Sequence, residues 1–209
     1  MNQKAFYKLT YGVYIISASA EGKDGGCVVN TLSQVTSSPA RLSVALNKNN
    51  HTLHLIQASG SFTGTVLSDQ ADIDLIRRFG FQSSRDKDKF QGIPMERDCL
   101  DNPYPTEGIS ARFSCRVIST LDLGSHVLVI GEAEDAEVLD ESAPVLTYSD
   151  YHLKKKGTTP PNAPSYQEAP KTVVGWRCSV CGYILESDTL PEDFVCPVCG
   201  RDASYFVKL

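Results

Sequence analysis

Four cysteines toward the C-terminal end of the sequence constrain the fold of this chain more than any other feature. They form two Cys-x-x-Cys pairs, Cys178 with Cys181 and Cys196 with Cys199, and a glycine follows each pair. Two such pairs can place four thiolates around one metal ion, an arrangement that suits iron or zinc. Disulfides are the alternative, but this spacing is typical of metal sites. The sequence therefore predicts a small metal-binding domain.

The residues beside the cysteines fit such a domain. Gly182 and Gly200 can adopt the positive φ that these turns often require, and Pro197 stiffens the second turn. A domain this small buries little apolar area, so we expect metal binding to supply much of its folding free energy. Iron held by four thiolates carries one electron at a time and has no open position for a substrate.

The flanks of the cysteine pairs resemble rubredoxin, the one-iron electron carrier, over residues 174–209. The resemblance rests on the stretches 176–183 (WRCSVCGY) and 190–200 (LPEDFVCPVCG). It favours iron over zinc, although a zinc ribbon has the same four ligands. Fourteen residues separate Cys181 from Cys196, fewer than in full-length rubredoxins and similar to rubredoxin-like domains fused to other redox proteins. The aromatic core implied by the resemblance consists of Trp176, Tyr183, Phe194 and Phe206.

The rest of the sequence narrows the class of protein. Its 209 residues allow one domain of ordinary size beside the small one. The net charge of −5 gives no reason to expect nucleic acid or an anionic membrane as a partner. No apolar run approaches the roughly 20 residues that span a bilayer, and the first residues lack the apolar region of a signal peptide. The remaining cysteines, Cys27, Cys99 and Cys115, are scattered like ordinary thiols, so we expect a cytoplasmic protein.

Prolines mark the boundary between the two domains. Pro160, Pro161, Pro164 and Pro170 oppose both helix and central strand, so the segment around them predicts an extended connector. We expect one domain over residues 1–153, a linker over 154–172 and the metal-binding domain over 173–209.

The first domain shows mostly strand patterns, separated by turn signals such as Asp24-Gly25-Gly26 and Ser38-Pro39. Helices are predicted over 50–60, from a capping asparagine to a glycine, and over 71–80, also ending at a glycine. We therefore expect a mainly β fold with a few helices, in the form of a closed or split β-barrel. Short runs rich in β-branched residues predict strands at 13–19, 27–32, 42–46, 62–67, 111–120 and 126–138.

Two polar segments of this domain could hold a ligand. The segment 30–39 is a predicted loop dense in hydroxyls and amides, which suit the polar edge of a flat heterocycle. The segment 47–52 opens the first predicted helix, and a helix N-terminus with a nearby lysine favours phosphate. Polar turns and helix caps are common without any ligand, so these residues alone leave the question open.

Residues 1 to about 166 resemble the flavin reductase family, whose fold is the FMN-binding split barrel. The matching stretches are 9–14, 30–39, 45–52, 77–90, 124–132 and 151–160. The resemblance implies bound FMN, NADH or NADPH as the electron donor, and a homodimer with the flavin near the subunit interface. The flavin contacts it implies are Asn30, Thr31, Leu32, Ser33, Gln34, Thr36 and Ser37 beside the ring and ribityl chain, and Asn47, Lys48, Asn50 and Thr52 around the phosphate.

His126 is the residue expected beside the nicotinamide, because it stands in the family setting Gly-x-His-x-x-x-x-Gly. Hydride transfer to a flavin depends on stacking geometry and exclusion of water, so this histidine would orient the substrate or tune charge. A strand histidine with an ordinary hydrogen bond is the alternative. Arg85 could bind phosphate or be a solvated surface arginine.

The two domains complement each other chemically. A nicotinamide gives electrons in pairs, a four-cysteine iron takes one, and FMN can exchange both. We expect an NAD(P)H-dependent FMN oxidoreductase that passes electrons to its own rubredoxin centre. The fusion resembles the high-molecular-weight rubredoxins of anaerobic bacteria, which implies a flavodiiron protein that reduces oxygen or nitric oxide as acceptor. The alternatives are a flavin reductase that releases reduced FMN and carries a zinc ribbon for docking, and a non-catalytic carrier of FMN and metal.

Overall fold

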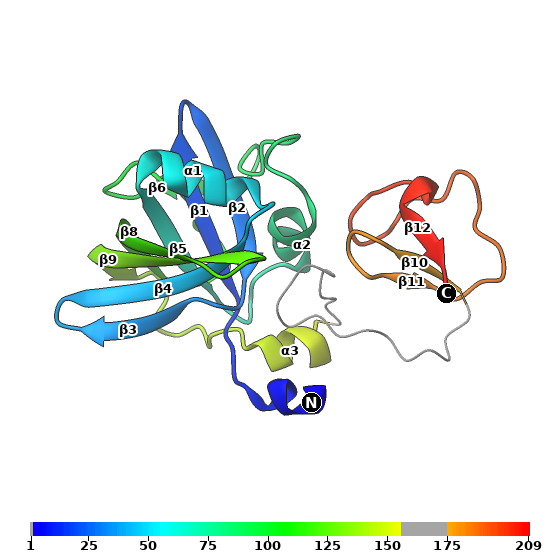
Figure 1. Ribbon diagram of the computed structural model, residues 1–209, viewed down its shortest axis with the longest axis horizontal. Helices are drawn as coiled ribbons and strands as arrows, with labels where there is room; N and C mark the ends of the chain where they lie inside the picture. The colour runs from blue at the N-terminus through cyan, green and yellow to red at the C-terminus, as the bar shows by residue number, and fades with distance from the viewer. Residues whose placement is uncertain (1, 156–174) are drawn as a thin grey trace.

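The computed structural model describes residues 2–155 and 175–209 and shows a larger β domain and a small domain that carries the cysteine pairs (Figure 1). In the main sheet the strands lie in the order β2-β1-β5-β8-β9-β4-β3, and neighbouring strands are antiparallel. The expected mainly β architecture is confirmed. The strands of this sheet are β1 (Tyr14–Ala20), β2 (Lys23–Val29), β3 (Ser33–Ser37), β4 (Ala40–Asn47), β5 (Ser61–Leu67), β8 (Ile109–Asp122) and β9 (His126–Val138).

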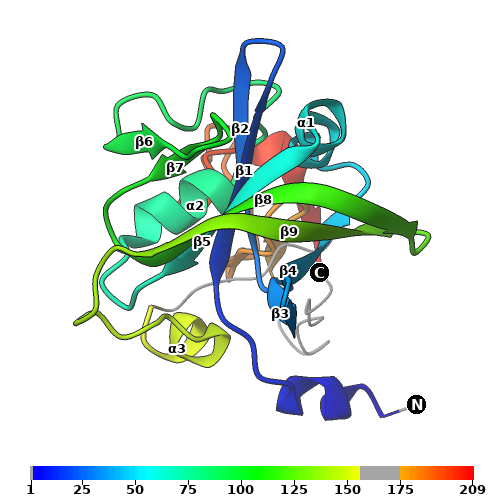
Figure 2. The same cartoon turned by 90° about the vertical axis from the view of Figure 1, so that its left-hand side faces the viewer.

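The sheet is buried on both faces, as the alternation of side chains along β1 shows. Ile16 belongs to an apolar cluster with Phe62, whereas Ile15, which points to the opposite face, belongs to a second cluster with Phe79. Helices α1 (His51–Ser59), α2 (Ile73–Phe81) and α3 (Tyr148–Leu153) lie around the sheet (Figure 2). The 3-10 helix η1 (Gln3–Lys8) precedes β1, and β6 (Met95–Arg97) pairs with β7 (Pro103–Pro105).

The first predicted helix is confirmed together with both of its caps. The Asn50 side chain accepts a hydrogen bond from the Thr52 amide at 3.0 Å. Gly60 ends the helix in the left-handed conformation, with φ of 72°, and its amide donates to the carbonyl of Ile56. These caps fix the direction of α1 and the position of its N-terminal amides.

Three expectations from the sequence were wrong. The segment 30–39, predicted as a loop, contains β3, an exposed edge strand paired with β4. The second helix does not end at Gly80 but continues to Phe81, whose side chain packs against the small domain. The expected turn at 24–26 lies within β2. The glycine at position 26 has a packing role instead, because a Cβ there would lie 2.7 Å from the ring of Phe79.

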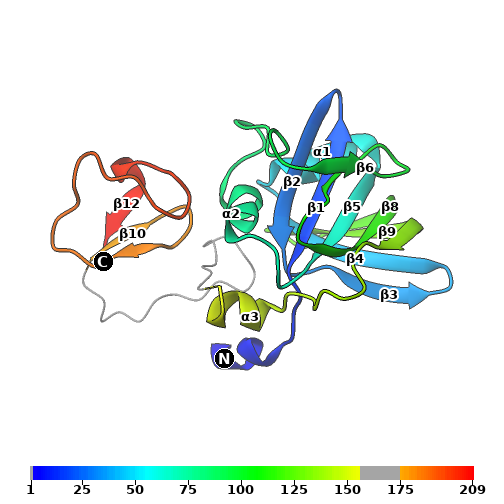
Figure 3. The same cartoon turned by 180° about the vertical axis from the view of Figure 1, so that it is seen from behind.

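The small domain consists of a three-stranded sheet and two cysteine loops, and it lies on the side of the larger domain where α2 is found (Figures 1 and 3). Cys178 in the central strand faces Phe206 in its neighbour. The predicted linker lies outside the described residues except at Lys154 and Lys155. The elements of the small domain are β10 (Trp176–Cys178), β11 (Ile184–Leu185), η2 (Ala203–Tyr205) and β12 (Phe206–Lys208), with the strands in the order β11-β10-β12.

Candidate functional site

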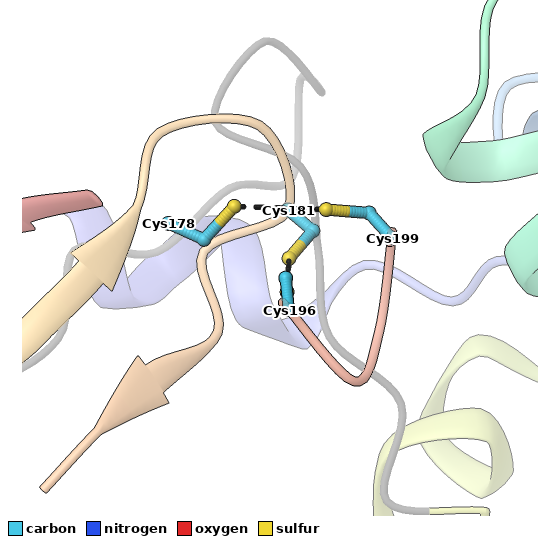
Figure 4. Close-up of side chains that lie close together, drawn as sticks. All are labelled: Cys178, Cys181, Cys196 and Cys199. Carbon is cyan, nitrogen blue, oxygen red and sulfur yellow. Dashed lines mark hydrogen bonds between the residues drawn. The ribbon is translucent and has the colours of Figure 1, made fainter. Parts of the chain in front are cut away.

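The structure brings the four cysteines of the two pairs together, with all four sulfur atoms within 4.8 Å of one another (Figure 4). The Sγ atoms of Cys178 and Cys199 are 3.6 Å apart, and those of Cys181 and Cys196 are 3.5 Å apart. A disulfide bond is about 2.05 Å long, so these thiols are free. A tetrahedral ion with metal–sulfur bonds of about 2.3 Å needs sulfur–sulfur distances near 3.8 Å. The four thiols therefore fit one tetrahedral metal ion.

The two cysteine loops have the same backbone construction. The Gly182 amide donates to the carbonyl of Cys178, and the Gly200 amide donates to the carbonyl of Cys196, both at 2.9 Å. Gly182 and Gly200 have φ values of 77° and 70°, so the expected positive φ is confirmed.

All four thiols are buried, and burial opposes the ionisation of Cys181 and Cys199 in the absence of a cation. At Cys178 burial is outweighed by backbone hydrogen bonds from Cys181 and Val180, which lower the pKa of this thiol. Burial raises the pKa of the Cys199 thiol to about 12 and also raises the pKa of Cys181. The Tyr183 amide lies 3.5 Å from the Cys181 sulfur and favours negative charge there. A metal ion would supply the positive charge that the buried thiolates lack, so the donor set fits a metal in charge as well as in geometry.

The aromatic residues predicted to form the core of the small domain do surround this centre. Phe206 is buried with the cysteines, and Trp176, Tyr183 and Phe194 pack against the cluster. The rings of Phe194 and Phe206 meet edge to face with centroids 5.2 Å apart. One residue of the larger domain, Phe81, also belongs to this cluster.

A cavity of about 330 Å³ lies beside the N-terminus of α1, and its wall consists of residues of the larger domain together with Val180 and Arg201 of the small domain. Its wall contains several of the predicted flavin contacts. The predicted residues that line it are Asn30, Thr31, Asn47, Asn50 and His126. Residues predicted from three separate parts of the sequence therefore lie together in one wall of the cavity.

Local hydrogen bonds explain how these residues are held. The Thr31 hydroxyl accepts from the Ala45 amide at 3.2 Å and donates to the Ala45 carbonyl at 2.9 Å, which ties the end of β2 to β4. Asn50 caps α1 through the Thr52 amide, and both Asn50 and His51 at this helix N-terminus line the cavity. A helix N-terminus of this kind offers amide donors and partial positive charge to a phosphate.

His126 begins β9 at the cavity and is half-buried. Its Nδ1 atom is 2.9 Å from the Ser125 hydroxyl, so Nε2 is not used by that contact. The residue is opposite Asn47 in the pairing of β4 with β9. This register brings the expected nicotinamide residue next to the expected phosphate loop.

The other predicted flavin contacts do not line the cavity. Lys48 is half-exposed and forms an ion pair with Asp122 at 2.6 Å, and the Thr52 side chain is fully buried. The β3 residues are exposed on an edge strand. The predicted contacts that lie away from the cavity are Leu32, Ser33, Gln34, Thr36, Ser37, Lys48 and Thr52.

The C-terminal end of α2 and the segment after it form a wall that was not assigned from the sequence. Phe79, Phe81 and Ser84 line the cavity there, and so do Tyr148 and Tyr151 of α3. The stretch 77–90 carries part of the resemblance to the flavin reductase family, and that resemblance is the signal in the sequence that points to this wall. Its individual contacts depend on tertiary packing.

The cavity has a positive electrostatic environment. Burial lowers the pKa of His51, and the nearby cations Arg85, Lys23 and Lys89 lower it further. Lys89 is 3% exposed and donates to the carbonyls of Gly26 and Phe79 at 2.7 and 3.0 Å. Burial lowers the pKa of Lys89 to about 8. Such surroundings favour an anionic ligand.

Comparison with known proteins decides the family. The flavin reductase like domain family matches residues 6–157, and the rubrerythrin, rubredoxin-like domain family matches residues 176–207. The chain belongs to the flavin reductase family. It carries a rubredoxin-like domain in the same polypeptide, as the cysteine motifs predicted.

Two relatives match the whole chain or most of it. The chain is 36% identical to the high molecular weight rubredoxin of Moorella thermoacetica over the full length of both proteins. It is 41% identical to the ferric-chelate reductase (NAD(P)H) of Archaeoglobus fulgidus, over 81% of this chain and 99% of that one. Among solved structures, nitrilotriacetate monooxygenase component B of Mycobacterium thermoresistibile superimposes with a TM-score of 0.61 at 27% identity, over 70% of this chain and 82% of that one.

Membership of these families establishes the chemical class. This flavin reductase is an oxidoreductase, and its expected cofactors are confirmed at the level of the families: FMN, an iron held by four cysteines, and NAD(P)H as donor. Within residues 2–155 and 175–209, no helix has the length and apolar character needed to cross a bilayer.

Proposed function

We propose that this flavin reductase takes electrons from NADH or NADPH, passes them one at a time to its own four-cysteine iron centre, and delivers them to a separate redox protein. The observation that carries the proposal is a shared boundary between the two sites. Phe81 lines the cavity and also packs in the cysteine cluster, and Val180 of the first cysteine loop lines the cavity too. Electrons that leave a flavin in this cavity would thus start next to the metal centre.

The residues of the cavity would bind and orient the two reactants. The first-turn amides of α1 would hold the flavin phosphate, with Asn50 fixing the helix start. Asn30 and Thr31 would border the ring, and His126 would orient the nicotinamide. When bound, FMN would link the two-electron chemistry of a nicotinamide to one-electron transfer, with each NAD(P)H oxidised balanced by two ferric ions reduced and one proton released.

We propose a homodimer in which the exposed residues of β3 reach the flavin of the partner subunit. Support comes from the edge strand itself, whose five residues are all exposed. Unpaired sheet edges are normally covered, and exposed Val35, Leu121 and Leu123 provide apolar surface for an interface. In this assembly Ser33 to Ser37 would remain flavin contacts although they lie away from the cavity of their own chain.

The proposal extends to the partner and to the cellular setting. A centre with four protein ligands relays charge and transforms no substrate, so an outside acceptor is required, and we propose a flavodiiron protein that reduces oxygen or nitric oxide. Seven free cysteines suit a reducing compartment, and we propose the cytoplasm. We propose domain boundaries at 1–153 and 173–209, with residues 154–172 as the linker.

The test is the absorption spectrum of the purified protein under anaerobic conditions, together with its metal content. We expect flavin and ferric-thiolate bands, both of which bleach on addition of NADH or NADPH. A flavin spectrum with one zinc per chain would instead support a reductase that releases reduced FMN. Bound flavin that does not respond to either nicotinamide would support a non-catalytic carrier.

A further inference from the structure

Phe81 occupies an unusual position at the end of α2. Phe79, two residues earlier, is 1% exposed and packs in the core of its own domain. Two residues along an α-helix correspond to a rotation of about 200°, so Phe81 points away from that core. Its side chain is nevertheless only 6% exposed. Phe81 belongs to neither of the two core clusters of its own domain.

Phe81 packs instead against the metal centre. Phe81 lies in one apolar cluster with Phe206 and the four cysteines, and it is the one residue of the larger domain in that cluster among the described residues. The first cysteine loop contributes Val180 to the cavity wall beside Phe81. The second loop, with Val198 and Cys199, lines a surface depression together with Arg77 of α2 and Gln82, the residue that caps this helix. Both cysteine loops therefore face the larger domain.

We propose that Phe81 is the positioning residue of an internal docking surface, on which the small domain seats its metal centre against the flavin cavity. The occupant is the rubredoxin-like domain of the chain itself. The inference rests on the proposed function and adds to it the contact that sets the speed of internal electron transfer. Docking converts the encounter of the two centres into an event within one molecule, at high effective concentration. A large apolar side chain at the centre of the contact is the typical anchor of such a surface.

The experiment compares full-length wild type with Phe81→Ala, the conservative variant Phe81→Leu, and the control Phe6→Ala, which truncates an exposed phenylalanine on η1. Flavin and iron contents are measured first. Rapid mixing with NADH then gives separate rates for the bleaching of the flavin band and of the ferric-thiolate band. Hydrogen exchange follows the amides at the end of α2 and in both cysteine loops.

The expected result is a split between the two steps. In Phe81→Ala the ratio of the iron-bleaching rate to the flavin-bleaching rate should fall about tenfold, which corresponds to about 1.4 kcal/mol of lost docking free energy. Exchange should increase at the end of α2 and in the loops, Phe81→Leu should recover most of both effects, and Phe6→Ala should match wild type. Iron bleaching and exchange at wild-type levels in Phe81→Ala would overturn the inference.

Hydrogen exchange keeps this inference distinct from the proposed function. If the iron band of wild type does not respond to NADH, electron relay fails, but loss of protection in Phe81→Ala would still establish the docking surface. If relay occurs and protection does not depend on residue 81, the docking role fails and the relay stands.

Discussion

Replacing Cys196 with alanine should separate the two halves of the electron path. Cys196 contributes one of the four clustered thiols, and its sulfur lies 3.5 Å from that of Cys181. Alanine removes the ligand without offering an oxygen in its place. Only three thiols would then remain for an ion that needs four ligands, so the iron should be lost from the purified variant.

The structure indicates how much stability the small domain loses together with its metal ion. Apart from the cysteines, Phe206 is the single side chain from the described part of the small domain that belongs to its buried cluster. A buried phenylalanine contributes about 1.5–3 kcal/mol, whereas a structural four-ligand metal in a small domain contributes about 10–16 kcal/mol of apparent binding free energy. Loss of the metal therefore removes the largest contribution to the stability of the small domain, which should unfold. The two core clusters of the larger domain contain none of these cysteines, so the larger domain should stay folded and lose only its contact through Phe81.

The assay combines metal analysis, thermal unfolding and two activities. Cys196→Ala should keep NADH-dependent bleaching of the flavin and lose electron delivery to an added one-electron acceptor protein. The matched control is Cys99→Ala, which removes an exposed cysteine outside the cluster and should behave as wild type. Full electron delivery by Cys196→Ala without iron would refute the reasoning, since the flavin would then reach the acceptor directly.

Three further changes test the cavity. Asn50→Ala should cost about 1 kcal/mol of unfolding free energy, because the α1 cap on the Thr52 amide is lost, and it should weaken flavin binding in a fluorescence titration; unchanged affinity would argue against a phosphate at this helix. Burial lowers the pKa of Lys89 from 10.5 to about 8, so between these values the unfolded chain binds more protons and wild-type stability rises with pH. Lys89→Met should lack that rise in chemical denaturation across this window, and an identical pH profile would contradict the assignment. His126→Ala should raise the KM for NADH more than it lowers kcat in steady-state kinetics, because the side chain orients the nicotinamide; a loss confined to kcat would point to a role in the transfer itself.

The parts of the fold that the sequence could predict are those with a local cause. The α1 caps and the positive φ of the two loop glycines depend on Asn50, Gly60, Gly182 and Gly200 themselves. The metal centre was predictable because the spacing of its cysteines fixes which sulfurs can meet. The aromatic flanks added the rubredoxin-like surroundings, since they pack directly on those sulfurs.

The parts that could not be predicted depend on distant contacts. The strand β3 lacks a buried side, so it has no alternation of apolar and polar residues that would indicate a strand. Gly25 and Gly26 resemble a turn in sequence, but their missing side chains make room for Leu55 and Phe79 against β2. Phe81 packs against the small domain, and no local signal in the sequence shows that contact.

Rapid mixing of the anaerobic wild-type protein with NADH or NADPH, at several protein concentrations, tests the central claim most directly. The account predicts that the ferric-thiolate band bleaches after the flavin band, with a rate that does not change with protein concentration because the electron moves within the molecule. An iron band that stays oxidised while the flavin is fully reduced would contradict it. So would an iron reduction rate that rises in proportion to protein concentration.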